Sequence, residues 1–404
     1  MIYKWGFFWF WLMLLWSAIL IVFNIMRLSS PYLGIDIVVF GVVANAVNFV
    51  FFIGVSIFVA LLCLWRGVAS IYSIYFIFAF LYGWMLWFVN EGDFFVAIKH
   101  MYLIVFAFFL FEFGRLIASE FDFTKLKKIF HFSFLVNLAA VPFFIAISSV
   151  WAVYPGYGVQ SIAYVGFYFL VSGSKYFFIL SCLILVAQGK RSILLSYIVC
   201  LFVYWALVVA KSRLILFTGL FLVPVFLAFL FFIVDFFEFY SVPGLSRLKY
   251  INPFSNDFDL FLGSSGRADE ILSIVKALAN YYFPYLFGAG FGFTYEWELS
   301  YRPGFSEIKS YLHNSPLMIY ILLGPVFALL FYIFFLGVTF SVMRASWREG
   351  EVSLLRFSAV SALFFLISGG FSLNILSDPI GWVFLGVLCA FSRRILSAQS
   401  IINS

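Results

Sequence analysis

Residues 316–342 read PLMIYILLGPVFALLFYIFFLGVTFSV, a stretch that holds no charged side chain. About 20 consecutive apolar residues in a helix are enough to cross the hydrocarbon core of a bilayer. Comparable runs occur at 5–25 and 68–89, and all of them are continuous rather than alternating, which disfavours a transmembrane β-barrel. The sequence therefore predicts an all-α, polytopic transmembrane helical bundle.

The composition excludes a water-soluble globular domain. Of the 404 residues, 65% are hydrophobic and only 10% are charged, whereas soluble domains are about 25% charged. The four cysteines lie in apolar runs without paired spacing, so neither a disulfide framework nor a metal site is indicated, and no cofactor is predicted. We expect about 11–12 spans. The candidates are 5–25, 43–64, 68–89, 98–117, 129–150, 161–187, 192–210, 214–237, 316–342, 353–373 and 380–391.

A long polar segment interrupts the apolar pattern. From Asp235 to His313 the chain carries nine acidic and six basic residues. We therefore expect one integrated membrane domain in three parts. These are N-terminal transmembrane helices at 1–237, an outer loop region with short helices at 238–315, and C-terminal transmembrane helices at 316–404.

Lysine and arginine set the expected orientation. Thirteen of these residues lie at one set of span ends and four at the opposite ends, and such an excess marks the cytoplasmic side. Both termini are therefore predicted to be cytoplasmic. The net charge of +6 reflects this topology rather than nucleic-acid binding.

The crossings before His313 leave two topologies open. Residues 211–213 and His313 are both expected on the outer face, so an even number of crossings separates them, yet 214–237 looks like a single span. Either Pro224 breaks this run into two half-helices, or 271–293 also crosses. We favour the first, because the charges in the second segment suit an interfacial helix better than a crossing.

Two cations on the outer face depart from the positive-inside trend. Lys211 and Arg213 occupy a short turn between apolar segments, near the level of lipid phosphates. Arg213 can donate paired hydrogen bonds to a diphosphate, and Lys211 can add charge. Interfacial anchors that bind ordinary lipid headgroups are an equally good interpretation.

His313 is one of three histidines and lies where the polar segment meets an apolar helix. A neutral imidazole there can accept the proton of a sugar hydroxyl as that hydroxyl attacks. Pro316 would begin the following helix and orient the histidine. The alternative is a structural histidine at a helix entry.

Other polar residues are candidate substrate contacts. Arg267 follows a glycine turn at a helix start, where it can bind an anion together with free backbone amides or pair with a neighbouring acid. Glu296 and Arg302, among tyrosines and a tryptophan, are typical of a sugar-contacting surface, although loop acids are usually only solvated. Lys175 falls in the middle of the predicted span 161–187, where a lysine is a functional candidate unless it snorkels to the cytoplasmic end.

Four short motifs follow one another along the chain. They are Ser212-Arg213, Ser265-Gly266-Arg267, the glycine-rich run from Leu286 to Gly292, and His313-Asn314 followed by Gly324 in an apolar helix. In this order they resemble the superfamily of O-antigen polymerases and O-antigen ligases, and the resemblance covers about residues 160–337.

The resemblance implies an integral-membrane glycosyltransferase of the bacterial inner membrane with its active face toward the periplasm. Its donor and acceptor would be undecaprenyl-diphosphate-linked oligosaccharides, used without a metal or other cofactor. Arg213 and Arg267 would hold the leaving diphosphate, and His313 would be the catalytic base, with Arg213 acting beside it.

One departure from the family concerns the diphosphate site. Related proteins often carry an arginine in the outer loop before the sixth span, whereas 151–160 has no charge at all. Lys211 or Lys175 would then substitute for it. Further substrate-binding candidates are Asn314, Arg302 and Glu296.

The leading interpretation is a polymerase of O-antigen or a related surface polysaccharide, with a chain-length regulator as a candidate partner and no nucleic acid. Its rival is the ligase that transfers finished polymer to the lipid A core, because both share these motifs. A lipid-linked oligosaccharide flippase or transporter without chemistry is the third alternative. Such a protein should show inverted repeats and broken helices.

Overall fold

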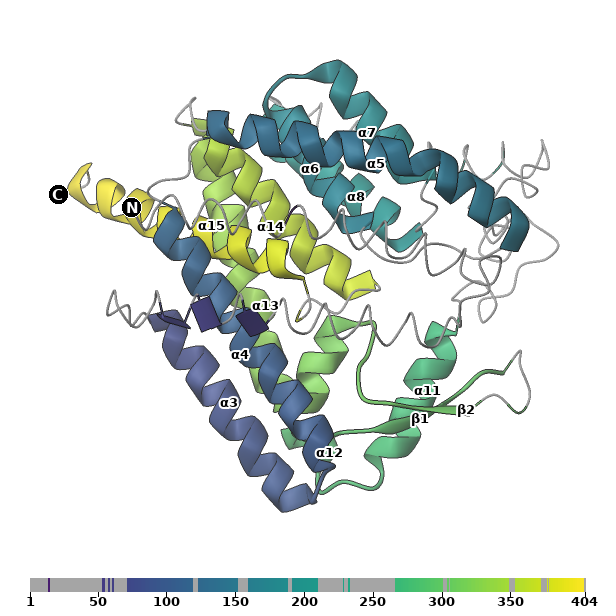
Figure 1. The fold of residues 1–404 in the computed structure, drawn as a ribbon. Coiled ribbons are helices and arrows are strands. Elements are labelled where there is room, and N and C mark those ends of the chain that lie inside the picture. The colour runs from purple at the N-terminus through teal and green to yellow at the C-terminus, as the bar shows by residue number, and fades with distance from the viewer. Residues whose placement is uncertain are drawn as a thin grey trace.

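The structure is a computed structural model, drawn in Figure 1, and most of what it describes is helical. The described residues are 71–118, 123–151, 159–187, 191–209, 266–300, 306–348, 353–371 and 378–402, with positions 14, 53, 54, 57, 58, 60, 61, 228, 232, 304 and 376. Most of the predicted run 214–237, including Pro224, lies outside these residues, as do the candidates Lys211, Arg213 and Arg302.

The described helices and strands follow one another along the chain in this order. They are α3 (Ile71–Asn90), α4 (Phe94–Ile117), α5 (Phe123–Trp151), α6 (Val159–Val171), α7 (Lys175–Ala187), α8 (Arg191–Tyr204) with a π-helical end (Trp205–Val209), α11 (Arg267–Leu278), α12 (Pro284–Phe287), β1 (Tyr295–Glu298), β2 (Ser306–Lys309), α13 (Ser315–Arg348), α14 (Ser353–Phe371) and α15 (Pro379–Ile402).

Three of the described helices are long and apolar enough to cross a membrane: Phe94–Ile117, Ser315–Met343 and Ser353–Gly370. This supports the expected membrane-spanning, mostly helical protein. The number of 11–12 spans stays a prediction, as do the orientation and the position of both termini.

The helical core is packed through close backbone contacts and aromatic rings. α15 lies against α4, where a β-carbon on Gly114 would come within 2.1 Å of the Val383 carbonyl oxygen and one on Gly386 within 2.0 Å of that of Phe111. Small residues allow apolar helices to approach this closely. Trp382 of α15 fills the adjoining space and is 1% exposed.

The prediction of a single span at 161–187 is wrong, because two shorter helices, α6 and α7, occupy it and pack against each other. Gly173 has a φ of 73°, a left-handed conformation that suits glycine. Its N–H donates to the Leu170 carbonyl, and the N–H of Ser174 donates to the Phe169 carbonyl. Together these hydrogen bonds form a Schellman motif, which ends α6.

The break removes Lys175 from the middle of a span. Each helix has 13 residues and therefore rises only about 20 Å, less than the roughly 30 Å hydrocarbon core. Lys175 begins α7 directly after the turn, and its side chain is exposed. The prediction that Lys175 lies in the middle of a span is therefore wrong.

α13 contains a break within residues 316–342, the uncharged stretch from which the helical fold is predicted. Gly324 has φ 80° and ψ 171°, so the helix is interrupted there before Pro325. Proline has no N–H to donate to the carbonyl four residues earlier, which is that of Ile321. The N–H groups of Ala289 and Gly290 donate to this carbonyl instead. A loop from outside the helix thus completes its hydrogen bonding.

The same glycine-rich loop joins α13 to α3. The Asn90 side-chain amide donates to the Ala289 carbonyl, and the Phe291 N–H donates to the Gly83 carbonyl. Gly288 has a φ of 86°, and a β-carbon there would lie 2.7 Å from backbone atoms of α13. The loop therefore holds the polar segment at one fixed place on α3 and α13.

The polar segment contains α11, α12 and a β-hairpin, which lie toward one end of the molecule, away from α5–α8 (Figure 1). α11 has only 12 residues, so 271–293 is not one continuous helix that could cross. β1 pairs antiparallel with β2, with Tyr295 opposite Lys309. The prediction of short helices alone missed this hairpin, although the alternating run YEWE at 295–298 is typical of a strand.

Candidate functional site

α11 carries the acidic groups of the site in its first turn. Gly266, with a φ of 81°, precedes the helix, and Asp269 and Glu270 follow where the helix dipole stabilises carboxylates. Both carboxylates are buried. Asp269 accepts a hydrogen bond from the Ser300 hydroxyl, 3.2 Å away, and so binds the end of the hairpin strand to the helix.

Glu270 and His313 form the centre of the site. Nδ1 of His313 lies 3.0 Å from Oε1 of Glu270. Because an ionised carboxylate only accepts hydrogen bonds, Nδ1 carries the proton and Nε2 keeps its lone pair. Among the residues that the structure describes, Nε2 has no hydrogen-bond partner. The Glu270 side chain is 4% exposed and that of His313 is 28% exposed, so a substrate can reach only the histidine.

Two further donors fix the Glu270 carboxylate. The Tyr295 hydroxyl lies 2.7 Å from Oε1 and 2.9 Å from the Tyr311 carbonyl oxygen, so its single proton can be donated to either. Arg267 Nη1 lies 3.3 Å from Oε2. With donors on both oxygens, the carboxylate is suited to orient His313 rather than to accept a proton from a substrate.

The two groups of the pair have pKa values that favour opposite charge states. Burial lowers the pKa of His313, and Arg267 and Lys309 lower it further; the hydrogen bond to Glu270 only partly offsets them, so the pKa lies below the ordinary value. Burial raises the pKa of Glu270, but the hydrogen bond from His313 and nearby positive charge lower it more. At neutral pH the pair is therefore a neutral imidazole beside a carboxylate.

Asn314 attaches the site to the membrane helices. It precedes α13, and its side-chain oxygen accepts a hydrogen bond from the Leu317 N–H at 2.9 Å, as an N-cap residue does. Its side-chain nitrogen donates to the Gly370 carbonyl of α14 at 2.8 Å. Both ends of the amide are thus engaged within the protein, which gives Asn314 a structural role besides the predicted substrate contact.

A second histidine fixes the chain just before His313. His100 is fully buried on α4, and its Nδ1 accepts a hydrogen bond from the Gly292 N–H at 3.2 Å. Its other ring nitrogen donates to the Ser310 carbonyl oxygen. Lys99 donates to the Ser310 hydroxyl at 3.0 Å. These contacts hold the backbone three residues before the catalytic candidate.

Lys309 is a cation of the site that the sequence interpretation missed. It is 6% exposed, and its Nζ lies 3.3 Å from the centre of the Trp297 ring and 3.7 Å from a Glu307 carboxylate oxygen. A cation over a tryptophan ring is stabilised by the ring's electron density. Burial lowers the pKa of Lys309, while Glu307 and Glu270 raise it.

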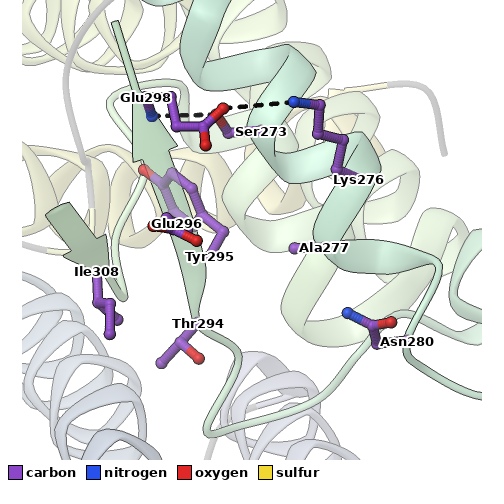
Figure 2. Close-up of a pocket in the computed structure, with 9 residues that line it drawn as sticks. All are labelled: Ser273, Lys276, Ala277, Asn280, Thr294, Tyr295, Glu296, Glu298 and Ile308. Carbon is purple, nitrogen blue, oxygen red and sulfur yellow. Dashed lines mark hydrogen bonds and ion pairs between the residues drawn. The ribbon is translucent and has the colours of Figure 1, made fainter. Parts of the chain in front are cut away.

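A pocket of about 370 Å³ lies between α11 and the unpaired edge of β1, shown in Figure 2. One wall comes from α11 and the turn after it, and the other comes from the hairpin. The lining residues are Ser273, Lys276, Ala277, Asn280, Thr294, Tyr295, Glu296, Glu298 and Ile308. Tyr295 belongs both to this pocket and to the Glu270 hydrogen-bond network, so the two are adjacent.

The structure brings together only part of the predicted site. Arg267 and His313 meet through Glu270, although they are far apart in the sequence. Glu296 lies on β1, where it accepts a short hydrogen bond from the Ser306 hydroxyl and lines the pocket. Lys175 does not join them: α7 and α11 lie in different parts of the molecule (Figure 1).

Two residues of the site, Glu270 and Lys309, were not predicted as functional, and Tyr295 was expected only as one aromatic residue of a sugar-contacting surface. The sequence carried only a weak signal for Glu270: a carboxylate in the first turn of a helix is explained by the helix dipole alone until its partner is known. Tyr295 and Lys309 depend on the hairpin register, which no local pattern specifies.

Comparisons of the chain with models of protein families, with characterised proteins and with solved structures found no match.

Proposed function

We propose that the protein is an integral-membrane glycosyltransferase that joins undecaprenyl-diphosphate-linked repeat units at the periplasmic face of the bacterial inner membrane. The observation that carries the proposal is the His313–Glu270 pair beside the start of an apolar helix long enough to span a bilayer. A neutral base in this position matches a reaction whose donor is a lipid and whose acceptor is a sugar hydroxyl.

The chemistry requires one proton acceptor. As an acceptor hydroxyl oxygen attacks the anomeric carbon, its proton moves to Nε2 of His313, and the carbon–oxygen bond to the diphosphate breaks with its electron pair on the diphosphate. The imidazolium that forms is stabilised by Glu270, to which it is already hydrogen-bonded at 3.0 Å. In this mechanism Glu270 is a positioning residue.

The leaving diphosphate requires cations. Arg267 uses one guanidinium nitrogen for Glu270, and its side chain is 32% exposed, which leaves further N–H groups for an anion. Arg213 is proposed to complete this site, as the family resemblance implies, and Lys211 is proposed to substitute for the loop arginine that 151–160 lacks. Lys175 is not included, because it is the exposed first residue of α7, which lies in a different part of the molecule from α11 (Figure 1).

A specific observation bears on the transporter alternative. Two apolar segments are broken, at Gly173 and Gly324, as in many transporters. At the second break, however, the freed Ile321 carbonyl accepts hydrogen bonds from the glycine-rich loop. This carbonyl is therefore not available to an ion, which favours a structural origin for the break.

The test is a His313→Ala variant in the native host. We expect an inserted protein and lipopolysaccharide that carries a single repeat on the core instead of a ladder. Normal ladders would refute the role of His313. A gene deletion separates polymerase from ligase, because loss of a polymerase leaves core plus one repeat, whereas loss of a ligase leaves bare core and lipid-linked polymer.

A further inference from the structure

We propose that the pocket between α11 and β1 binds one neutral, hydroxyl-bearing sugar residue of the acceptor glycan. That the sugar belongs to the acceptor glycan rests on the proposed function, whereas the sugar site itself rests on the pocket. Its volume of about 370 Å³ is at the lower end of the range for small-molecule sites and suits a single sugar ring rather than a long chain.

The lining groups match a sugar. The hydroxyls of Ser273 and Thr294 and the amide of Asn280 can both donate and accept hydrogen bonds. The Asn280 side chain has no hydrogen-bond partner among the described residues, and Figure 2 shows it at the end of the pocket near Thr294. Ala277 and the 77%-exposed Ile308 supply apolar surface for the carbon–hydrogen face of a ring.

The charges of the pocket determine which part of the substrate it accepts. It contains two carboxylates, of Glu296 and Glu298, and one ammonium group, of Lys276, which lies 3.4 Å from Glu298. The remaining negative charge disfavours a diphosphate or an acidic sugar. Arg267, by contrast, lies at the N-terminal end of the same helix, so anion and sugar are separated along α11.

The location of the pocket connects it to His313. Tyr295 lines the pocket, and its hydroxyl lies 2.7 Å from the carboxylate that holds His313. Ser273 is three residues beyond Glu270, less than one turn farther along α11. A sugar bound here would therefore be linked to His313 through Tyr295 and Glu270. The attacking hydroxyl would belong to this sugar or to the adjacent sugar of the same glycan.

The experiment measures sugar binding without turnover. Full-length protein in lipid nanodiscs is titrated with N-acetylglucosamine, galactose, rhamnose and glucuronate, and binding is followed by saturation-transfer NMR. We expect saturable binding of at least one neutral sugar and none of glucuronate. Ala277→Leu, which fills the pocket, should abolish binding. Glu296→Gln should weaken it about tenfold, as expected when a hydrogen bond to a charged group is replaced.

Two controls keep the result interpretable. Glu91→Gln removes a carboxylate from the turn after α3, outside the pocket, and should bind as the wild type does. His313→Ala should retain binding, so a failure of the proposed transfer reaction leaves the pocket assignment intact. Wild-type protein that binds none of the neutral sugars, or Ala277→Leu and Glu296→Gln variants that both bind them unchanged, would overturn the proposal.

Discussion

Replacing Glu270 with glutamine is the sharpest test of the His313–Glu270 pair, or dyad, because the substitution removes one charge and keeps almost the same side-chain shape. In the wild type, the carboxylate accepts the His313 Nδ1–H at 3.0 Å and also contacts Tyr295 and Arg267. Glutamine keeps one oxygen, which can still accept from His313 and Tyr295, and places its amide nitrogen where Arg267 met the second carboxylate oxygen. The fold should therefore persist while the histidine loses its anionic partner.

The magnitude follows from the loss of a hydrogen bond to a charged group. Such a bond contributes about 1.5–3 kcal/mol, and about 1.4 kcal/mol corresponds to tenfold in rate. Because the His313 side chain is 28% exposed and water screens the charge, we take the lower half of this range. The expected result is a fall in kcat of about ten- to fortyfold.

The pH dependence supplies a second readout, one that a merely structural role would not move. The hydrogen bond and charge of Glu270 raise the pKa of His313, whereas burial, Arg267 and Lys309 lower it. Removing the Glu270 charge therefore lowers this pKa further. Since the base is active when neutral, the acidic limb of kcat/KM should move to lower pH while the plateau falls.

The assay follows elongation of an undecaprenyl-diphosphate-linked repeat unit by purified protein in nanodiscs between pH 4.5 and 8.5. Glu91→Gln is the matched control, because it makes the same chemical change outside the site. An unchanged plateau in the Glu270→Gln variant, or an acidic limb that moves to higher pH, would refute the reasoning.

Three further predictions concern the residues around the dyad and the helix break. Lys309→Met removes a positive charge that lowers the pKa of His313, so the acidic limb of kcat/KM should move to higher pH; a shift to lower pH would contradict this. Tyr295→Phe removes the 2.7 Å hydrogen bond to Glu270 and should cost about 1 kcal/mol of stability, measured by thermal unfolding, with an unchanged midpoint as the contrary result. Gly324→Ala forces a β-carbon to 2.7 Å from the Phe287 carbonyl oxygen at a φ of 80°, and should destabilise the protein by about 1–3 kcal/mol. Gly337→Ala in the same helix, where nothing lies within 4 Å, should be neutral, and equal losses in both variants would show that the break is not the cause.

Part of the candidate site could be predicted because single residues carry its chemistry. His313 stood out as a histidine at the entry to an apolar helix, and Arg267 as a cation after a glycine turn. Their partner Glu270 could not be identified in this way, since it lies 43 positions before His313 and meets it only when α11 packs near the start of α13. Lys309 likewise joins the site through the register of β1 and β2.

The sequence by itself determined that this protein is mostly helical, with apolar runs long enough to span a membrane and one polar segment between them. Long uncharged runs have few alternatives, because backbone polar groups in lipid must be satisfied within the helix. Only the tertiary structure decided where those helices stop. The Gly173 turn uses its own neighbouring carbonyls, but the break at Gly324 depends on N–H groups from the loop at 288–292. A hydrogen bond between segments more than thirty residues apart produces no recognisable pattern in the sequence of either segment. Only the tertiary structure therefore shows which apolar run is one continuous helix and which is divided.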